Sequence, residues 1–139
     1  MILVDSNVLI ALSDRGDRLH ASAAADLRRL VNDDLLLTAP VLTEVAFGLP
    51  TAAQRANTRD LVRELHIRPC PVPEGPHLWD EVFAWLERYA EHEPDWADAH
   101  LAVLCGRERR FRVWTYDGEF TRLWRRPDGS RIPLAARRG

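Results

Sequence analysis

The chain opens on an apolar run that turns polar within one step. Residues 1–4 (MILV) carry no polar side chain, and Asp5, Ser6 and Asn7 follow at once. A short apolar run with branched side chains is typical of a strand in the interior of a sheet. In open α/β sheets the functional site lies just beyond the carboxyl ends of the strands, so this junction is a candidate site.

Further along, short apolar runs alternate with helical spacing. The runs predict strands over 35–38, 67–72 and 112–115 and a brief edge strand over 132–134. Apolar residues three and four positions apart predict helices over 6–12, 20–31, 40–48, 51–65, 76–90, 94–107 and 118–124. Pro69 and Pro71 confine the third strand to an edge of the sheet or push it out. Strands that alternate with helices predict an α/β fold, a three-layer α/β/α sandwich with a central parallel sheet.

Length and composition favour one domain over residues 1–139, with an arginine-rich C-terminal extension from about residue 125. No apolar run is as long as a membrane span and no basic segment precedes the first strand, so we expect a cytoplasmic protein without membrane contact. Cys70 and Cys105 form no CxxC or Cys/His pattern, which argues against zinc. All 19 basic residues are arginines, and the absence of lysine excludes Schiff-base and Walker-type phosphate chemistry.

One glutamate has no partner on its own helix. The residues one turn from Glu44 are Pro40, Val41, Phe47 and Gly48, none of which can pair with a carboxylate. The helix is apolar nearly all round, so we expect burial, and a buried unpaired carboxylate is costly. A bound cation would remove that cost, whereas the alternative is a glutamate at the helix surface near the domain edge.

Two aspartates lie one turn apart on the helix predicted over 94–107. Asp95 and Asp98 share a face, and like charges at this spacing destabilise a helix by roughly 0.2–0.5 kcal/mol. Either the helix N-terminus or a cation compensates for this repulsion. The first-turn position of Asp95 favours the helix dipole, and the deeper position of Asp98 favours the ligand role.

The remaining candidates, Asp5 and Asp117, both lie where a strand gives way to a helix. Asp5 or Ser6 is also a natural helix cap, and Asp117 with Gly118 is also a common hairpin turn pair. The helical spacing after Asp117 favours a strand-to-helix junction over a hairpin.

Four carboxylates brought together would repel one another unless a divalent cation were bound between them. Oxygen ligands without histidine or cysteine suit Mg²⁺ or Mn²⁺. Such sites usually serve phosphate chemistry, in which the metals lower the pKa of a bound water and stabilise an in-line displacement.

Taken in order and spacing, these residues resemble the PIN-domain family and, within it, the VapC-type toxin ribonucleases of bacterial toxin-antitoxin pairs. The resemblance covers nearly the whole chain and rests on four segments: residues 2–7 (ILVDSN), 43–45 (TEV), 98–102 (DAHLA) and 115–117 (TYD) with Phe120 behind.

The resemblance implies a parallel sheet flanked by helices, an acidic site for Mg²⁺ or Mn²⁺, and endonucleolytic cleavage of RNA. It implies that the metal-binding, catalytic acids are Asp5, Glu44, Asp98 and Asp117. Asn7 would support them by hydrogen bonding, Thr115 lies in the last motif, and Asp95 shares or exchanges the role of Asp98. The family also implies a homodimer and a small cognate antitoxin whose C-terminal segment blocks the active site.

An RNA substrate requires cations around such an acidic pocket. The candidate RNA-binding residues are Arg110, Arg112, Arg122, Arg125 and Arg126. A solvated arginine face is the alternative for most of them. Trp124, beside two of these arginines, is a candidate for base stacking.

Two other functions compete with the ribonuclease. A phosphatase of the haloacid dehalogenase type also begins with a strand ending in aspartate, but it needs a second aspartate where this chain has Asn7, and it commonly uses a lysine. A PIN-like module that binds RNA or protein without cleavage is the second alternative, and the presence of all four acids argues against it.

Overall fold

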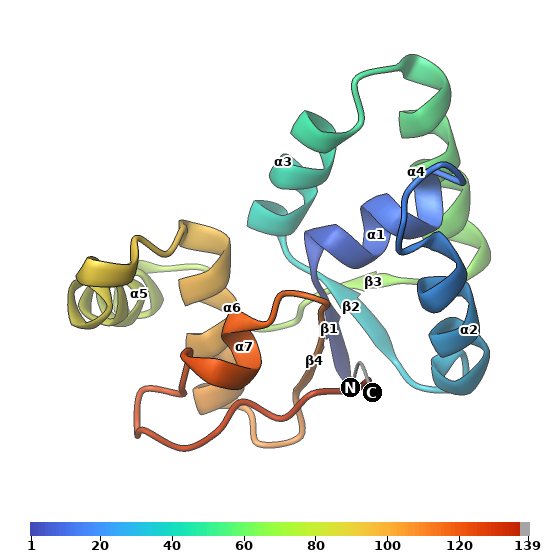
Figure 1. Ribbon diagram of the computed structural model, residues 1–139. Helices are drawn as coiled ribbons and strands as arrows, with labels where there is room; N and C mark the ends of the chain where they lie inside the picture. The colour runs from blue at the N-terminus through green and yellow to red at the C-terminus, as the bar shows by residue number, and fades with distance from the viewer. Residues whose placement is uncertain (137–139) are drawn as a thin grey trace.

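Strand β1 (Ile2–Val4) lies inside a four-stranded sheet with the order β3-β2-β1-β4. The computed structural model describes residues 1–136. β1 pairs in parallel with β2 (Leu35–Leu37) on one side and with β4 (Arg112–Trp114) on the other. Helices cover both faces of this sheet, which is why β1 and β2 contain only apolar residues. The predicted three-layer sandwich with a central parallel sheet is confirmed (Figure 1).

The third strand is much shorter than predicted. β3 comprises only Arg68–Pro69 and lies at the edge of the sheet, next to β2. Its position follows from its prolines, because a proline has no amide hydrogen to donate to a neighbouring strand. Of the two alternatives that the prolines left open, the edge position is the one observed, and the predicted length is wrong.

Most helices begin and end within two residues of the predicted positions. Their bounds are α1 (Ser6–Ser13), α2 (His20–Leu30), α3 (Ala39–Gly48), α4 (Ala52–Glu64), α5 (Pro76–Arg88), α6 (Trp96–Arg107) and α7 (Glu119–Arg122), with a 3₁₀ turn at Ala90–His92. α7 is a single turn, shorter than predicted. No helix in residues 1–136 is long and apolar enough to cross a membrane.

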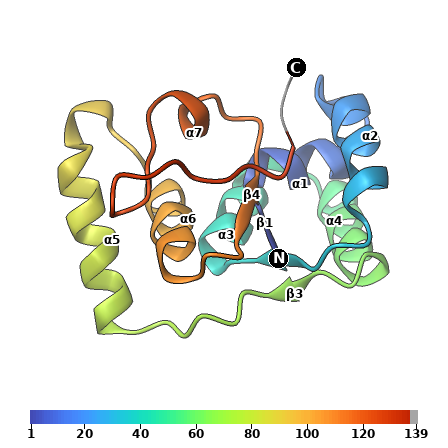
Figure 2. The same ribbon diagram turned by 90° about the horizontal axis from the view of Figure 1, so that it is seen from below.

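The helices form two layers. Helices α1, α2 and α4 lie on one side of the sheet, and α5, α6 and α7 lie on the other (Figures 1 and 2). Helix α3 contacts both α1 and α6, so it joins the two layers. It follows β2 directly, which places it at the carboxyl ends of the strands, the edge where a site is expected.

After α7 the chain returns beside β4. Arg125 and Arg131 form an antiparallel bridge, and Leu134 forms a parallel bridge with Val113 (Figure 2). The hairpin-like extension predicted from about residue 125 thus packs on the domain, and the predicted strand over 132–134 is a single bridge. The last three residues of that extension, 137–139, lie outside the described part of the chain.

Candidate functional site

Asp5 lies at the centre of the candidate site, just after β1. It is 4% exposed, and its Oδ1 atom accepts a hydrogen bond from the Ser6 amide (2.8 Å), which caps α1. Its Oδ2 atom accepts hydrogen bonds from the Thr115 hydroxyl (2.7 Å) and from Asn7 Nδ2 (3.4 Å). Asp5 is therefore both a helix cap and a link to the end of β4.

Thr115 and Asn7 join the two strand-to-helix junctions. Thr115 Oγ1 accepts hydrogen bonds from Asn7 Nδ2 (3.2 Å) and from the Asp117 amide (3.1 Å). Asn7 Oδ1 in turn accepts a hydrogen bond from the Tyr116 amide (3.0 Å). Asp5 and Asp117, 112 positions apart in the sequence, are thereby held at one edge of the sheet.

Asp117 precedes a helix and not a returning strand. Its Oδ1 atom accepts a hydrogen bond from the Glu119 amide (2.9 Å), where α7 begins. The hairpin alternative for the Asp117–Gly118 pair is therefore wrong, and the strand-to-helix junction predicted from the helical spacing is confirmed.

Glu44 meets the site through α1. The Ser6 hydroxyl donates a hydrogen bond to Glu44 Oε2 (2.6 Å), so Glu44 has a partner that its own helix could not provide. The expectation that α3 is buried nearly all round is wrong, because Leu42 and Phe47 are 43% and 85% exposed. The helix packs inward through only part of its apolar surface, and Glu44 lies half-buried at the boundary.

Asp95 and Asp98 occupy the start of α6. Asp95 is the N-cap and not a first-turn residue, because its Oδ1 atom accepts a hydrogen bond from the Asp98 amide (2.8 Å). The Asp95 amide is paired in turn with Asp98 Oδ2 (3.4 Å). Asp95 is exposed and serves as a cap, whereas Asp98 is half-buried and closer to the sheet.

Burial and neighbouring carboxylates raise the pKa of three acids of this cluster, Asp5, Glu44 and Asp98. Burial raises the pKa of Asp5, and the nearby charges of Asp117 and Asp95 add to the effect. Burial and the charges of Asp95 and Asp5 raise the pKa of Asp98 to about 8. Burial, followed by Asp95 and Asp5, raises the pKa of Glu44 to about 7, although the Ser6 hydroxyl lowers it. The three other candidate acids, Glu44, Asp98 and Asp117, and also Asp95 therefore lie within electrostatic reach of Asp5.

This donor set suits a hard divalent cation by its chemistry. Every candidate ligand is a carboxylate, and a bound cation would offset the burial and the neighbouring charges that raise the pKa values of Asp5, Glu44 and Asp98. In the described conformation, however, no three His, Cys, Asp or Glu side chains of residues 1–136 are arranged to hold a metal ion. Binding would therefore require side-chain rotation at one or more of these acids.

Without divalent cations, the protein is expected to be less stable at about pH 8.5 than at about pH 5.5. The pKa values of Glu44 and Asp98 lie at about 7 and about 8 in the folded chain, above the ordinary values of 4.5 and 3.8. Between these values the folded chain binds more protons than the unfolded chain, so the free energy of unfolding falls as pH rises. Thermal unfolding in EDTA across this range checks the sign, and Asp98→Asn should flatten the dependence. A melting temperature that rose with pH would contradict it.

Two candidate RNA-binding arginines lie away from the acids. β4 begins at Arg112 and ends before Asp117, so Arg110 and Arg112 lie at the opposite end of the strand. Arg112 pairs with Asp33 (3.3 Å) and Arg110 with Glu108 (3.0 Å). The predicted strand over 112–115 already indicates this separation, because in a parallel sheet the site lies at the carboxyl ends of the strands and these two arginines lie at the amino end.

The arginines after α7 also differ in exposure. Arg126 is 8% exposed and donates a hydrogen bond to the Cys105 carbonyl (3.1 Å), which is a structural contact. Arg125 donates to the Trp124 carbonyl (2.9 Å). Trp124 is 3% exposed and packs against Trp85, so the hypothesis that it stacks on a base is wrong. Arg122, one turn after Asp117, remains exposed beside the acids.

Two comparisons with known proteins agree on the fold. Residues 2–125 match the sequence model of a family described as PIN domain. The crystal structure of Mycobacterium tuberculosis VapC20, described as a Sarcin-Ricin loop cleaving toxin, is similar with a TM-score of 0.70 and 22% sequence identity, covering 88% of this chain and 94% of that chain. No curated protein matches the sequence.

Proposed function

This chain belongs to the PIN-domain family, and from that premise we propose that it is a Mg²⁺- or Mn²⁺-dependent endoribonuclease and the toxin of a toxin-antitoxin pair. The observation that supports the activity most is the convergence of Asp5, Glu44, Asp98 and Asp117 at one edge of the sheet. The similarity to VapC20, a Sarcin-Ricin loop cleaving toxin, supports RNA as the substrate class.

The chain's own residues would orient the reacting groups. Hydrogen bonds from Ser6 and Thr115 fix the orientation of the Asp5 carboxylate, and Asn7 binds the Tyr116 amide. These bonds hold the segments that carry Asp5 and Asp117 at a fixed position relative to one another. A bound divalent cation would lower the pKa of the attacking water and stabilise charge on the phosphate. Asp5, Asp98, Asp117 and Glu44 are the residues that would hold it.

A PIN-like module that binds RNA without cleavage is the alternative function. Purified protein incubated with total RNA and Mn²⁺ is expected to yield discrete fragments, and EDTA is expected to abolish them. Binding without fragments under any divalent cation would favour the alternative. Fragments that persist in EDTA would exclude a metal-dependent mechanism.

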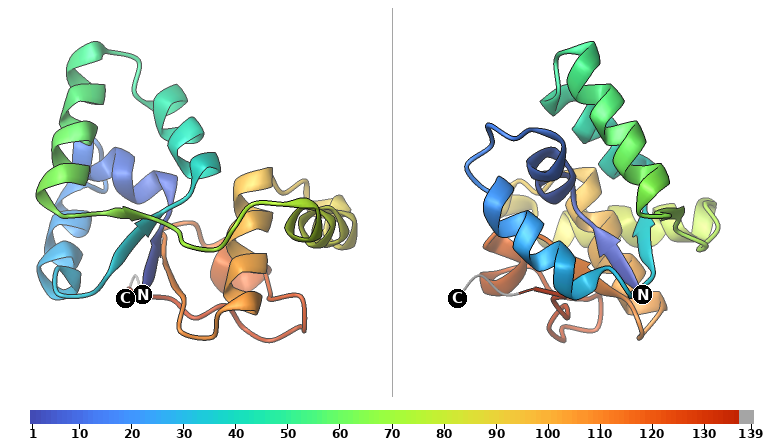
Figure 3. Two further views of the ribbon diagram at one scale, coloured as in Figure 1. Left: turned by 180° about the vertical axis from the view of Figure 1, so that it is seen from behind. Right: turned by 90° about the vertical axis from the view of Figure 1, so that its right-hand side faces the viewer.

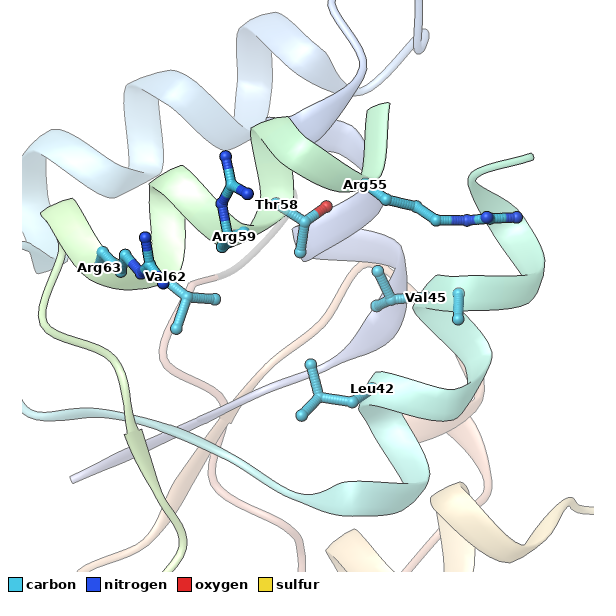
Figure 4. A pocket seen from close by; sticks show the side chains of 8 residues that line it. Leu42, Val45, Arg55, Thr58, Arg59, Val62 and Arg63 are labelled. Atoms are coloured by element: carbon cyan, nitrogen blue, oxygen red, sulfur yellow. The ribbon is translucent and has the colours of Figure 1, made fainter. Parts of the chain in front are cut away.

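This chain has a groove whose chemistry suits binding of the proposed antitoxin. Helices α3 and α4 are joined at one end and diverge above α1, as Figure 3 shows. Between them lies a groove of about 390 Å³ with an apolar floor that includes Leu42, Val45 and Val62 (Figure 4). Arg55, Arg59 and Arg63 line it from α4.

A groove between two helices, apolar below and basic along one side, fits an amphipathic helix that carries acidic residues on its flank. We therefore place a helical segment of the antitoxin in this groove. The proposed homodimer has different candidate contacts, since Trp79 and Phe83 on α5 are 44% and 56% exposed.

A further inference from the structure

A second cleft begins at Asp117 and runs between α7 and the returning C-terminal segment. Its volume is about 780 Å³. Residues 115–118 and 120–122 line it on one side, and Arg126, residues 131–134 and Ala136 complete the lining. The lining combines two aromatic residues, three arginines and apolar side chains, and within residues 1–136 Asp117 is its one carboxylate.

Tyr116 lines this cleft and is fixed from several directions. Its hydroxyl donates a hydrogen bond to Asp26 Oδ2 of α2 (2.6 Å) and accepts one from Trp114 Nε1 (3.1 Å). Its amide is bound to Asn7 (3.0 Å). Burial and the hydrogen bond to Asp26 raise the pKa of the phenol, so it remains the donor to this buried carboxylate. A ring held in this way loses little conformational freedom when a ligand packs on it.

Arg122 lies close to the acidic end of the cleft. A Cβ atom at Gly118 would be 2.8 Å from Arg122 Nη1, so the guanidinium lies directly over the Gly118 backbone, next to Asp117. Arg122 pairs with Glu119 (2.6 Å), but its side chain is 71% exposed. Exposed ion pairs of this kind contribute little, so a phosphate can replace the glutamate as partner. Arg131 lines the opposite wall and is also exposed.

We propose that this cleft binds the single-stranded RNA segment that adjoins the cut, with Tyr116 as the platform for one base and Arg122 and Arg131 as contacts to its phosphates. An aromatic platform combined with a basic groove is the usual means by which proteins bind single-stranded nucleic acid. The inference rests on the proposed function, because the strand would reach the acids past Asp117.

The test measures RNA binding separately from cleavage. A labelled single-stranded oligoribonucleotide of mixed sequence is titrated with protein in EDTA, and fluorescence anisotropy is recorded at several salt concentrations. Tyr116→Ala is expected to weaken binding about tenfold, and Tyr116→Phe to retain most of the affinity because the ring remains. Arg122→Ala and Arg131→Ala are each expected to reduce the slope of log K against log salt by about 0.7.

Arg68→Ala is the matched control, because Arg68 of the edge strand β3 also forms an exposed ion pair, with Asp34 (3.1 Å), and lies outside the cleft. It is expected to leave affinity and slope unchanged. If Tyr116→Ala fails to fold, the two arginine variants still decide the question. Unchanged slopes in both would overturn the proposed path. If the wild-type protein cleaves RNA but the substitutions do not affect RNA binding, the proposed RNA path is wrong and the proposed nuclease activity stands. If the substitutions weaken RNA binding but the wild-type protein does not cleave RNA, the proposed nuclease activity is wrong and the RNA path stands.

Discussion

Asp5→Asn is expected to abolish RNA cleavage while the fold remains as stable as in the wild type, or becomes more stable. Asp5 is the most buried of the four candidate acids, at 4% exposure, and loss of a primary ligand should cost more than the roughly 10- to 100-fold that loss of an outer hydrogen-bond partner costs. Stability is retained because the asparagine side chain can still accept a hydrogen bond from the Ser6 amide and because one repelling charge is removed. Cleavage rates in Mn²⁺ and thermal unfolding in EDTA measure the two effects.

The matched control is Asp14→Asn. Asp14 also accepts a backbone hydrogen bond, from the Gly16 amide (2.9 Å), but it lies at the far end of α1. This variant should cleave RNA at the wild-type rate. Normal cleavage by the Asp5 variant would show that the catalytic residues have been assigned wrongly.

Leu42→Asp is expected to weaken binding of the antitoxin at least about 100-fold without changing cleavage by the free enzyme. The side chain lines the apolar floor of the groove between α3 and α4, and a partner helix would bury the new carboxylate without a counter-charge. Titration calorimetry with the purified antitoxin measures the affinity, and the RNA assay measures the activity.

Val31→Asp provides the comparison for that variant. Val31 is 48% exposed, close to the 43% of Leu42, but it lies at the end of α2 outside the groove. An equal loss of antitoxin affinity in both variants, or in neither, would contradict docking in the groove.

The local sequence predicted the elements well, because most of them are defined by short-range patterns. The apolar run before Asp5, the helical spacing around Asp98 and the prolines of the third strand each determine a feature that the structure contains. The same patterns placed Asp5 and Asp117 at two similar junctions. Parallel strands then bring the two junctions together, which is why the candidate site was accessible from the sequence.

Long-range contacts escaped this kind of prediction. The Ser6 hydroxyl that meets Glu44 lies 38 positions away, and Asp26, which holds Tyr116, lies 90 positions away. No local pattern marks such pairs. The position of Ser6 in the polar segment after β1 was one indication that it belongs to the site. Nothing in the sequence indicated that Asp26 contacts Tyr116.

The misjudged burial of α3 has a different cause. An apolar helix was expected to be covered by the rest of the chain, yet Phe47 is 85% exposed. An apolar composition indicates that a helix face is buried, but it does not indicate whether the same chain or a binding partner buries it. Leu42, which is exposed and lines the groove between α3 and α4, therefore supports the proposed antitoxin contact.

The central claim is that the acids after β1 and β4, with Glu44 and Asp98, form one divalent-cation site. Anomalous diffraction from a crystal soaked in Mn²⁺ tests it directly. We expect a Mn²⁺ peak within coordination distance of Asp5 and of at least one of Asp98, Asp117 and Glu44, after rotation of their side chains. A peak only at other surface acids, or no peak in crystals of protein that cleaves RNA in the same buffer, would contradict the claim.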